Sequence, residues 1–277
     1  MGTARIAKLD EYGLLHAAGD DARAFLHAQL SNDIEHLAPD KARYAGWCSA
    51  KGRLLATFLV VPCPDGFLLQ LSRDLVPVVA KRLSMFILRS KVKLADATGE
   101  WLQYGLWAPL PGGALSVRQT KDRIEVGIDA DRTLLITKTP QSADTAAGDW
   151  ALAEVRAGRP LIVQKTQDQF VPQMVNLELA GGVDFGKGCY PGQEVVARAQ
   201  YRGAVKRRMY RLRGATLQPG QDLYSDDAPG QASGTVVNAA GDESLAVLQI
   251  SSVETGSPIR AEPKAAALEI LPLPYAQ

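Results

Sequence analysis

The chain has 277 residues, a formal net charge of +1, 46% hydrophobic residues and 22% charged residues. This balance is typical of a folded globular protein and excludes a mainly disordered chain, while the near-zero charge argues against a general nucleic-acid binder. At roughly 100–200 residues per domain, the length indicates one large domain or two to three small ones.

The cysteine content indicates a reducing compartment. Cys48, Cys63 and Cys189 form no C-x-x-C pair, so they do not resemble a disulfide framework or an all-cysteine metal site. The N-terminus lacks the apolar core of a signal peptide, and the longest apolar stretch, 54–63, is too short to span a bilayer. We therefore expect a cytoplasmic protein that does not enter a membrane.

The first hundred residues predict a compact α+β unit. Residues 12–18 read as a strand, and Gly19 leads into a helix over 20–30 with one apolar face. A hairpin around Lys51-Gly52, a strand, a helix and another strand then follow, at 43–61, 67–72, 74–88 and 91–97. Three strands, a helix and a strand in this order favour an α+β arrangement.

The rest of the chain predicts further strands and a small antiparallel barrel. Strands are expected at about 101–107, 122–128 and 132–138, and a helix capped by Asp149 is stopped by Gly158 and Pro160. A loop-rich region precedes a short helix at about 193–200. From Lys206 onward, short strands alternate with Gly, Pro and Asp turns, which is typical of a small barrel or sandwich.

Cys189 is the candidate reactive residue. It lies in a glycine-rich segment, 181–192. Two residues after it, Pro191 suits the first position of a helix. A helix N-terminus and the nearby Lys187 would both favour the thiolate form. The alternative is a structural thiol beside a tight turn.

The stretch after Glu194 is locally basic. Seven positive residues and no acid lie before Asp222, namely Arg198, Arg202, Lys206, Arg207, Arg208, Arg211 and Arg213. Such a run could bind an acidic ligand tail or RNA, or it could be a solvated strand face. His16, His27 and His36 show no metal or catalytic spacing and are expected to be surface or satisfied core residues.

At this point the residues resemble a known family. The segment KGCYPGQEVVARAQYRGAVKR resembles the K-G-C-Y-x-G-Q-E motif of YgfZ-type folate-binding proteins, relatives of the glycine-cleavage T-protein. FLHAQLSNDI, CSAKGRLLATF and FVPQMVNLELAGGVDF are similar to other segments of the family, and the ending LEILPLPY is also similar. The resemblance therefore covers nearly the whole chain.

The resemblance implies a multi-lobed GcvT-like α+β fold with folate in a central cavity. It implies a folate-binding lobe over 1–42 and 98–203, an inserted lobe over 43–97 and a C-terminal barrel over 204–277. The ligand would be tetrahydrofolate or a derivative. The implied folate-binding residues are Tyr12, Trp150, Asn32, Asn176, Glu194, Arg198 and Arg202, and the motif cysteine is Cys189, with Lys187 beside it. Two family tryptophans map to Tyr12 and Trp150, and a tyrosine ring can still stack.

Two functions stay open on these residues. The family resemblance implies an accessory protein that supports iron–sulfur cluster assembly or repair, and through iron–sulfur enzymes tRNA modification, with folate and iron–sulfur proteins as partners and no direct nucleic-acid binding. The alternative is a folate-dependent aminomethyl transferase. In the T-protein pattern R-x-E-A-G a glutamate holds the pterin, whereas EVRAG places Arg156 there, and arginine has no acceptor atom. This departure favours the accessory function. A cysteine-dependent hydrolase is disfavoured because no histidine spacing supports it.

Overall fold

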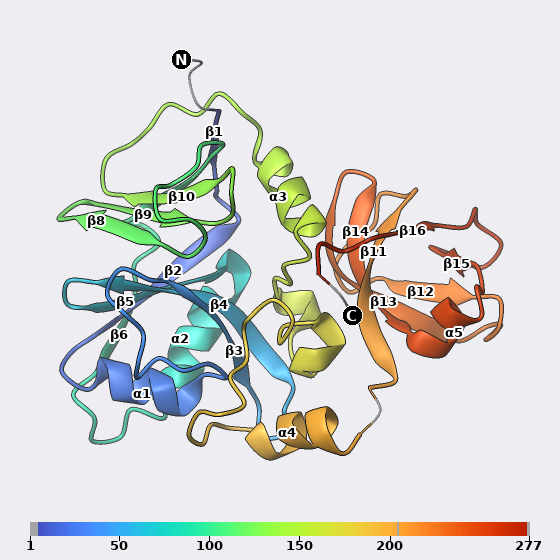
Figure 1. Ribbon diagram of the computed structural model, residues 1–277, viewed down its shortest axis with the longest axis horizontal. Helices are drawn as coiled ribbons and strands as arrows, with labels where there is room; N and C mark the ends of the chain where they lie inside the picture. The colour runs from blue at the N-terminus through green and yellow to red at the C-terminus, as the bar shows by residue number, and fades with distance from the viewer. Residues whose placement is uncertain (1–4, 204, 276–277) are drawn as a thin grey trace.

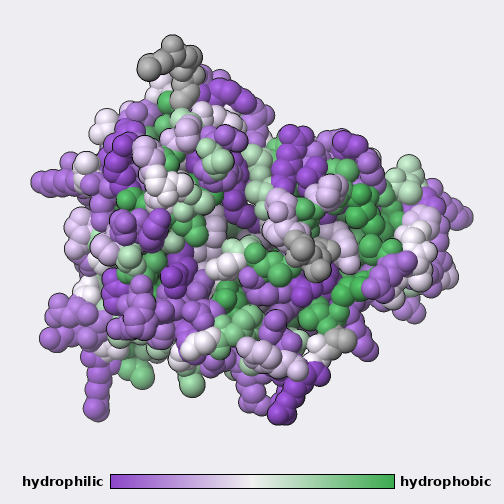
Figure 2. Space-filling view, viewed as in Figure 1, coloured by the Kyte–Doolittle hydropathy of each residue, from purple (hydrophilic) through white to green (hydrophobic). Residues whose placement is uncertain are grey.

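The structure is a computed structural model that describes residues 5–203 and 205–275. Within these residues three antiparallel sheets form a larger lobe, built from two of them, and a smaller C-terminal lobe (Figure 1). The expected α+β class is confirmed. Figure 2 shows a mostly hydrophilic face on which apolar side chains gather between the two lobes.

The central sheet of the larger lobe has the strand order β3-β4-β5-β2-β6. Its strands are β2 (Tyr12–Ala18), β3 (Arg43–Cys48), β4 (Leu54–Cys63), β5 (Gly66–Ser72) and β6 (Lys93–Asp96). Along β4, Phe58 and Val60 join one hydrophobic cluster while Leu59 and Val61 join another. Because both faces of the sheet are buried, β4 reads as a continuous apolar run rather than an alternating one.

Two helices cover one face of this sheet. These are α1 (Ala22–Gln29) and α2 (Val76–Ser84), the latter preceded by a 3-10 turn, η1 (Arg73–Leu75). The helix predicted over 74–88 therefore ends early. Leu88 has a φ of 44°, which a right-handed helix does not allow, so the last apolar residues of the pattern lie in a turn.

The second sheet packs on the opposite face, with the order β1-β7-β10-β9-β8. Its strands are β1 (Ile6–Lys8), β7 (Leu102–Leu106), β8 (Val117–Thr120), β9 (Arg123–Gly127) and β10 (Thr133–Thr137). The pattern missed β8, because only one of its four residues is buried. The following helix α3 (Ala147–Arg156) begins before the predicted cap, and Asp149 lies within it and pairs with Arg5.

Few regular elements occur between α3 and the C-terminal lobe, as predicted. Two 3-10 turns, η2 (Gln164–Thr166) and η3 (Pro172–Val175), precede α4 (Gln193–Tyr201). The segment between these two turns folds across the end of the central sheet, where Leu54 N donates to Phe170 O (2.7 Å). This irregular segment connects the two lobes.

The C-terminal lobe is a six-stranded sheet with the order β15-β12-β13-β14-β11-β16. Its elements are β11 (Arg207–Arg213), β12 (Asp222–Ser225), β13 (Ala232–Ala240), β14 (Glu243–Gln249), α5 (Ile250–Glu254), β15 (Ile259–Arg260) and β16 (Glu269–Leu271). The two edges meet, because Ala267 bridges Arg260 and Leu268 N donates to Ile259 O at 2.7 Å. The sheet thus curls into the expected small barrel.

The first strands tie the two sheets of the larger lobe together. β1 lies in the sheet of β7–β10, whereas β2 lies in the sheet of β3–β6 and pairs with both β5 and β6. Residues 12–18 therefore share a sheet with residues 43–96. The lobe boundaries drawn at 42/43 and 97/98 remain a prediction about domains. Among the described residues, the helices are all too short or too polar to cross a bilayer.

Candidate functional site

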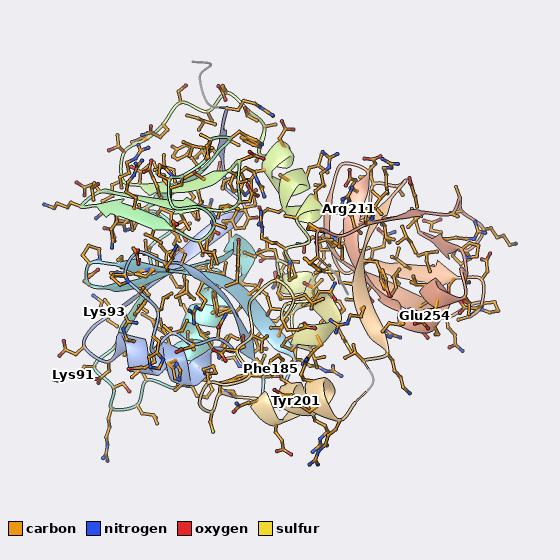
Figure 3. The ribbon with its side chains drawn as sticks, in the orientation of Figure 1. Lys91, Lys93, Phe185, Tyr201, Arg211 and Glu254 are labelled. Carbon is orange, nitrogen blue, oxygen red and sulfur yellow. The ribbon has the colours of Figure 1, made fainter. Side chains whose placement is uncertain are left out.

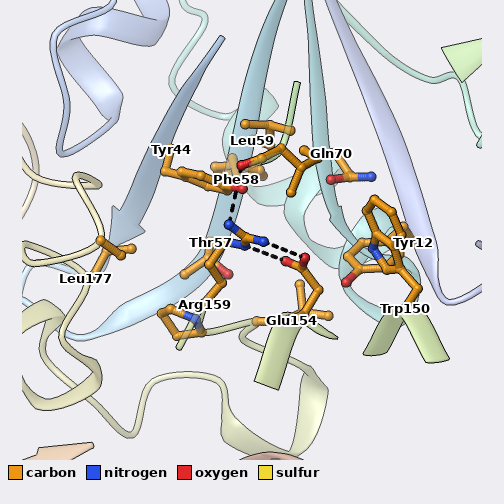
Figure 4. Close-up of a pocket in the computed structure, with 14 residues that line it drawn as sticks. Tyr12, Tyr44, Thr57, Phe58, Leu59, Gln70, Trp150, Glu154, Arg159 and Leu177 are labelled. Carbon is orange, nitrogen blue, oxygen red and sulfur yellow. Dashed lines mark hydrogen bonds and ion pairs between the residues drawn. The ribbon is translucent and has the colours of Figure 1, made fainter. Parts of the chain in front are cut away.

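A pocket lies between the central sheet and α3. Aromatic side chains, apolar side chains and a few polar ones form its wall (Figure 4). The lining residues are Tyr12, Tyr44, Thr57, Phe58, Leu59, Gln70, Ile128, Trp150, Glu154, Arg159, Pro160, Leu161, Leu177 and Ala180. The empty space between these residues, including open solvent at its mouth, is about 600 Å³.

A second hollow adjoins this pocket and shares Tyr12, Glu154, Arg159 and Leu161 with it. It extends toward the C-terminal lobe, where Asn238 and Ala239 of β13 contribute to its wall. The pair Glu154–Arg159 therefore lies between the two hollows, and a ligand longer than one ring system could pass beside it.

A buried ion-pair network forms the charged part of the pocket. Arg159 donates from Nε and Nη2 to the two carboxylate oxygens of Glu154 (2.9 and 3.0 Å) and also reaches Asp129 (3.0 Å). Arg132 pairs with Glu154 (2.8 Å) and with Asp129 (2.6 Å). Two guanidinium groups thus balance two carboxylates.

The pKa values follow this arrangement. Burial opposes the charge on Arg159, but the Glu154 carboxylate outweighs it and raises the pKa of Arg159. Burial likewise works against ionised Asp129, and the hydrogen bonds from Arg132 overcome this and lower the pKa of Asp129. Burial raises the pKa of the Tyr44 hydroxyl to about 12. Arg159 and Asp129 are therefore charged at neutral pH and the Tyr44 hydroxyl is neutral.

Tyr12 and Trp150, the two aromatic residues singled out in the sequence, both line the pocket. Trp150 is only 3% exposed, because its ring packs against Gly105, makes an edge contact with Trp107 (centroids 5.7 Å) and lies under the Arg132 guanidinium (4.7 Å). The ring is therefore fixed as part of the wall. Stacking of a ligand on either residue remains a prediction.

The structure alters the argument about Arg156. Its side chain lies outside the pocket lining and donates from Nε and Nη2 to Glu243 Oε1 of β14 (3.0 and 2.8 Å). Glu154, two residues earlier on α3, provides a carboxylate in the pocket instead. Arg156 stands in the place of the T-protein glutamate, as the sequence indicates, but the pocket still contains a carboxylate acceptor from the same helix. The R-x-E-A-G pattern aligns its glutamate with Arg156, so it does not identify Glu154 as the pocket carboxylate.

Three of the motifs recognised in the sequence meet at the other end of the central sheet. Lys187 donates to the carbonyl oxygens of His27 and Leu30 at the end of α1, the latter at 2.9 Å. Gly192, with φ of 78°, lies so close to the turn at Gly52 that an added Cβ would be 2.3 Å from Ser49 O and 2.7 Å from Gly52 Cα. The segments LSND, CSAKG and KGCYPGQE thus form one backbone assembly.

Cys189 lies on the surface of this assembly and is exposed, whereas Cys48 is buried and Cys63 is half-buried. Gly192 caps α4 and Gln193 is its first residue, as predicted for the helix at about 193–200, but Pro191 lies outside the helix and does not occupy its first position. Cys189 is consequently separated from the helix start by three residues. Lys187 is committed to backbone carbonyls, and burial lowers its pKa to about 8.

His27 is a neighbour of the motif that sequence spacing did not identify. A Cβ added at Gly188 would lie 3.6 Å from His27 Nε2, and His27 Nδ1 faces Asp33 (3.1 Å). Burial opposes ionisation of Asp33, but its hydrogen bonds with His36 lower the pKa of Asp33. An imidazole and a carboxylate therefore lie beside the residue that precedes Cys189.

The two predicted asparagines have structural partners. Asn32 donates its amide hydrogens to Tyr44 O and Gly181 O, both at 2.7 Å. Asn176 is fully buried, donates to Met209 O (2.8 Å) and accepts from Arg208. Neither lines the pocket. Asn32 nevertheless fixes the backbone of Tyr44, which does.

Glu194, Arg198 and Arg202 lie together on and just after α4, away from the pocket. Arg198 pairs with Glu194 (3.0 Å), and the three residues surround a shallow surface hollow with Tyr201. Tyr201 in turn contacts Phe185 at a centroid distance of 5.9 Å (Figure 3). The structure does not bring these residues to Tyr12 and Trp150, and their contact with folate remains a prediction.

Ion pairs neutralise part of the basic stretch in the folded structure. Arg208, Arg211 and Arg213 pair with Glu178, Glu243 and Glu269, and Arg198 pairs with Glu194. Within the described part of the chain, Arg202, Lys206 and Arg207 have no acidic partner. Four of the seven charges are therefore neutralised by acidic partners.

Comparison with known proteins gives a consistent result. The chain is 30% identical to the tRNA-modifying protein YgfZ of Klebsiella pneumoniae (strain 342), over 96% of this chain and 91% of that protein. It is also 30% identical to the tRNA-modifying protein YgfZ of Photorhabdus laumondii, over 98% and 92% of the two chains. No protein-family model matches it.

Among solved structures, the chain is similar to the glycine cleavage system aminomethyltransferase T from Bartonella henselae. The TM-score is 0.70 with 15% sequence identity, over 98% of this chain and 86% of that one. At this level of identity the likeness concerns the fold, and it confirms the GcvT-like architecture expected from the sequence.

Proposed function

Since this chain belongs to the YgfZ family, we propose that it binds a reduced folate in the Glu154 pocket and supports tRNA modification through iron–sulfur enzymes. The observation that carries the folate part is the pocket itself: flat aromatic walls with a single ion-paired carboxylate. Cys189 acts separately, as an exposed thiol on the motif assembly. We place this activity in the cytoplasm, with folate and iron–sulfur proteins as partners.

The donor and acceptor inventory of the pocket suits a pterin ring. A pterin is flat and presents N–H donors beside a carbonyl oxygen. Glu154 has about four acceptor positions, of which Arg159 fills two, while Arg132 Nη1 forms an ion pair with the carboxylate (2.8 Å) without a hydrogen bond, so acceptor capacity remains for a ligand N–H. Thr57 accepts from Ile162 N (3.0 Å), which leaves its hydroxyl hydrogen free to donate. Tyr12, Tyr44 and Phe58 would cover the ring.

Calorimetry with tetrahydrofolate tests the pocket. Glu154→Asp keeps the charge balance of the network but withdraws the carboxylate by one methylene, and we expect it to weaken binding by about tenfold, or ~1.4 kcal/mol. Arg156→Gln is the matched control on the same helix, because Arg156 faces Glu243 instead. Equal affinities for the two variants, or no heat with the wild type, would contradict the site.

Complementation tests the role of the thiol. In cells that lack the endogenous family member, Cys189→Ala should fail to restore the modified nucleosides of tRNA, measured by mass spectrometry, although the purified variant still binds tetrahydrofolate. His27→Gln tests whether the neighbouring imidazole assists the thiol. Full rescue by Cys189→Ala would reduce the residue to a structural one and leave the folate proposal standing.

Arg202 lies away from the pocket, so the three basic residues without an acidic partner would meet only the far end of a long folate tail. Arg202, Lys206 and Arg207 would attract the γ-linked carboxylates of a polyglutamylated folate, and exposed charges are screened by salt. The polyglutamate should therefore bind more tightly than the monoglutamate at low salt, with a gain that shrinks as salt rises. Equal affinity at low salt would assign the patch to solvent.

Aminomethyl transfer to tetrahydrofolate is the second candidate. The observation that favours it is Glu154, which provides a pocket carboxylate although Arg156 stands in the place of the T-protein glutamate. The test is formation of methylenetetrahydrofolate from an aminomethylated protein donor, followed by mass spectrometry. Turnover that survives Cys189→Ala would favour the transferase over the accessory function.

A further inference from the structure

Three potential metal ligands meet at one end of the central sheet, outside the folate pocket and the motif assembly. His16 is on β2, Cys63 is the last residue of β4, and Asp65 is in the tight turn that leads to β5. The register pairs Cys63 with Gly66 and Ala18 with Gly66, which brings the β4–β5 turn alongside β2. Of the residues described, these three form the one His, Cys and acid group compact enough to hold a metal ion.

The three donor atoms face a common point. Cys63 Sγ is 3.6 Å from His16 Nε2 and 3.6 Å from Asp65 Oδ1, and Nε2 is 3.1 Å from the same Oδ1. The thiol and the carboxylate thus approach the same imidazole nitrogen. A catalytic relay would place the acid on Nδ1 and the nucleophile on Nε2, so this arrangement does not fit a cysteine nucleophile.

The separations agree with tetrahedral zinc coordination. With zinc bonds of about 2.3 Å to sulfur, 2.0–2.1 Å to imidazole nitrogen and 2.0–2.2 Å to carboxylate oxygen, tetrahedral angles place the ligands about 3.5, 3.5 and 3.3 Å apart. The observed distances are 3.6, 3.6 and 3.1 Å. Thiolate, imidazole and carboxylate are all established zinc ligands.

We propose that His16, Cys63 and Asp65 bind one divalent cation of the zinc type, with a fourth position open to water. Binding forms the metal–sulfur bond as the thiol S–H bond breaks and its proton leaves to solvent. Access exists, since the Asp65 side chain is 67% exposed while that of His16 is 22% exposed. The ion would join β2 to the β4–β5 turn, which already meet through the Ala18–Gly66 pair and a contact between Gly19 N and Asp65 O (3.4 Å).

The site shares a strand with the pocket. Tyr12 and His16 lie on the same face of β2, four residues apart, which is about 13 Å along an extended strand. An ion at His16 would therefore fix the strand that supplies Tyr12 without touching the pocket. The proposal is independent of the folate function and of Cys189.

Cobalt substitution tests the site on the full chain. In a Cys189→Ser background, added Co²⁺ should produce a thiolate charge-transfer band in the near ultraviolet that one equivalent of Zn²⁺ abolishes. Cys63→Ser or His16→Gln in the same background should lose the band and the one-to-one zinc isotherm. His36→Gln is the matched control, because it removes another exposed histidine and leaves the cluster intact.

Thermal unfolding provides the second readout. Zn²⁺ should raise the melting temperature of the parent and of His36→Gln, since a ligand that binds only the folded chain stabilises it, and should not raise that of Cys63→Ser. Equal melting temperatures in EDTA establish that the variants fold. Absence of the band, a band that persists in Cys63→Ser, or equal zinc uptake by all variants would overturn the proposal.

Discussion

The Glu154 pocket and the Cys189 assembly are built in opposite ways. The pocket depends on side chains: two acids and two arginines with little or partial exposure neutralise one another behind aromatic walls. The assembly depends on main-chain contacts: Lys187 donates to a carbonyl oxygen at the end of α1, and Gly192 packs against the backbone of the turn at Gly52. The Cys189 thiol is exposed on its surface. One region therefore encloses a pocket and the other exposes a thiol, so the two can be altered separately by substitution.

The largest expected effect is on the pocket side. Glu154→Gln leaves Arg132 and Arg159 with Asp129, which is half-exposed, as their acidic partner, and removing one partner of a buried ion pair typically costs about 3–5 kcal/mol. Urea unfolding should show this loss, whereas Cys189→Ala, at an exposed site, should change stability by less than about 0.5 kcal/mol. Similar costs for the two variants would remove the distinction between the regions.

The next effect concerns the main chain of the assembly. Gly192→Ala introduces a Cβ 2.3 Å from Ser49 O at a φ of 78°, and we expect a loss of about 2–3 kcal/mol. Gly186→Ala is the matched control, since its added Cβ meets nothing closer than 3.4 Å and its φ is not positive. The free energies of unfolding of the two variants provide the measurement, and equal values would refute the close backbone contact.

A smaller effect is expected for Lys187→Met, with a pH dependence of defined sign. The variant leaves two carbonyls without their donor, at a cost of about 1–3 kcal/mol. Burial lowers the pKa of Lys187 to about 8, against about 10.4 for an unfolded lysine. Between these values the unfolded chain binds more protons, so the contribution of Lys187 to stability rises with pH. The stability difference between wild type and variant should grow from pH 8 to 10, and a flat difference would contradict the burial.

The smallest expected effect concerns the reactivity of the thiols rather than the stability of the fold. Burial raises the pKa of Cys48 to about 12, and burial followed by the Asp65 carboxylate raises that of Cys63 to about 12. Both thiols are thus protonated at pH 8, while Cys189 is exposed. Iodoacetamide should add one label, and peptide mapping should locate it at Cys189. Early labelling of Cys63 would show that its end of the sheet opens.

The sequence predicted the elements that depend on local patterns. The apolar run of β4, the glycine stop after α3 and the turn-rich C-terminal strands all appear as expected. The family resemblance identified the fold and two residues of the pocket wall, Tyr12 and Trp150. The sequence pattern missed strand β8 because only one of its four residues is buried. It placed the end of α2 too late because the periodicity continues to Leu88, whose positive φ lies outside a right-handed helix.

The charged part of the pocket could not be predicted, because its members are distant in sequence. Asp129 and Arg132 come from a turn between β9 and β10, while Glu154 and Arg159 flank the end of α3. Neither pair has a spacing that marks a site. The same limit applies to His27, which reaches the motif only because Lys187 binds the end of α1.

The way the C-terminal barrel closes has a consequence for self-association. Residues 267–271 serve both edges of the sheet, bridging β15 on one side and pairing with β11 on the other. A single short segment thereby hides two rows of backbone donors and acceptors that would otherwise invite another strand. A chain shortened from Ala267 onward would expose both edges at once. It should form oligomers through strand pairing, visible as a larger species in size-exclusion chromatography, before it loses the fold of the larger lobe.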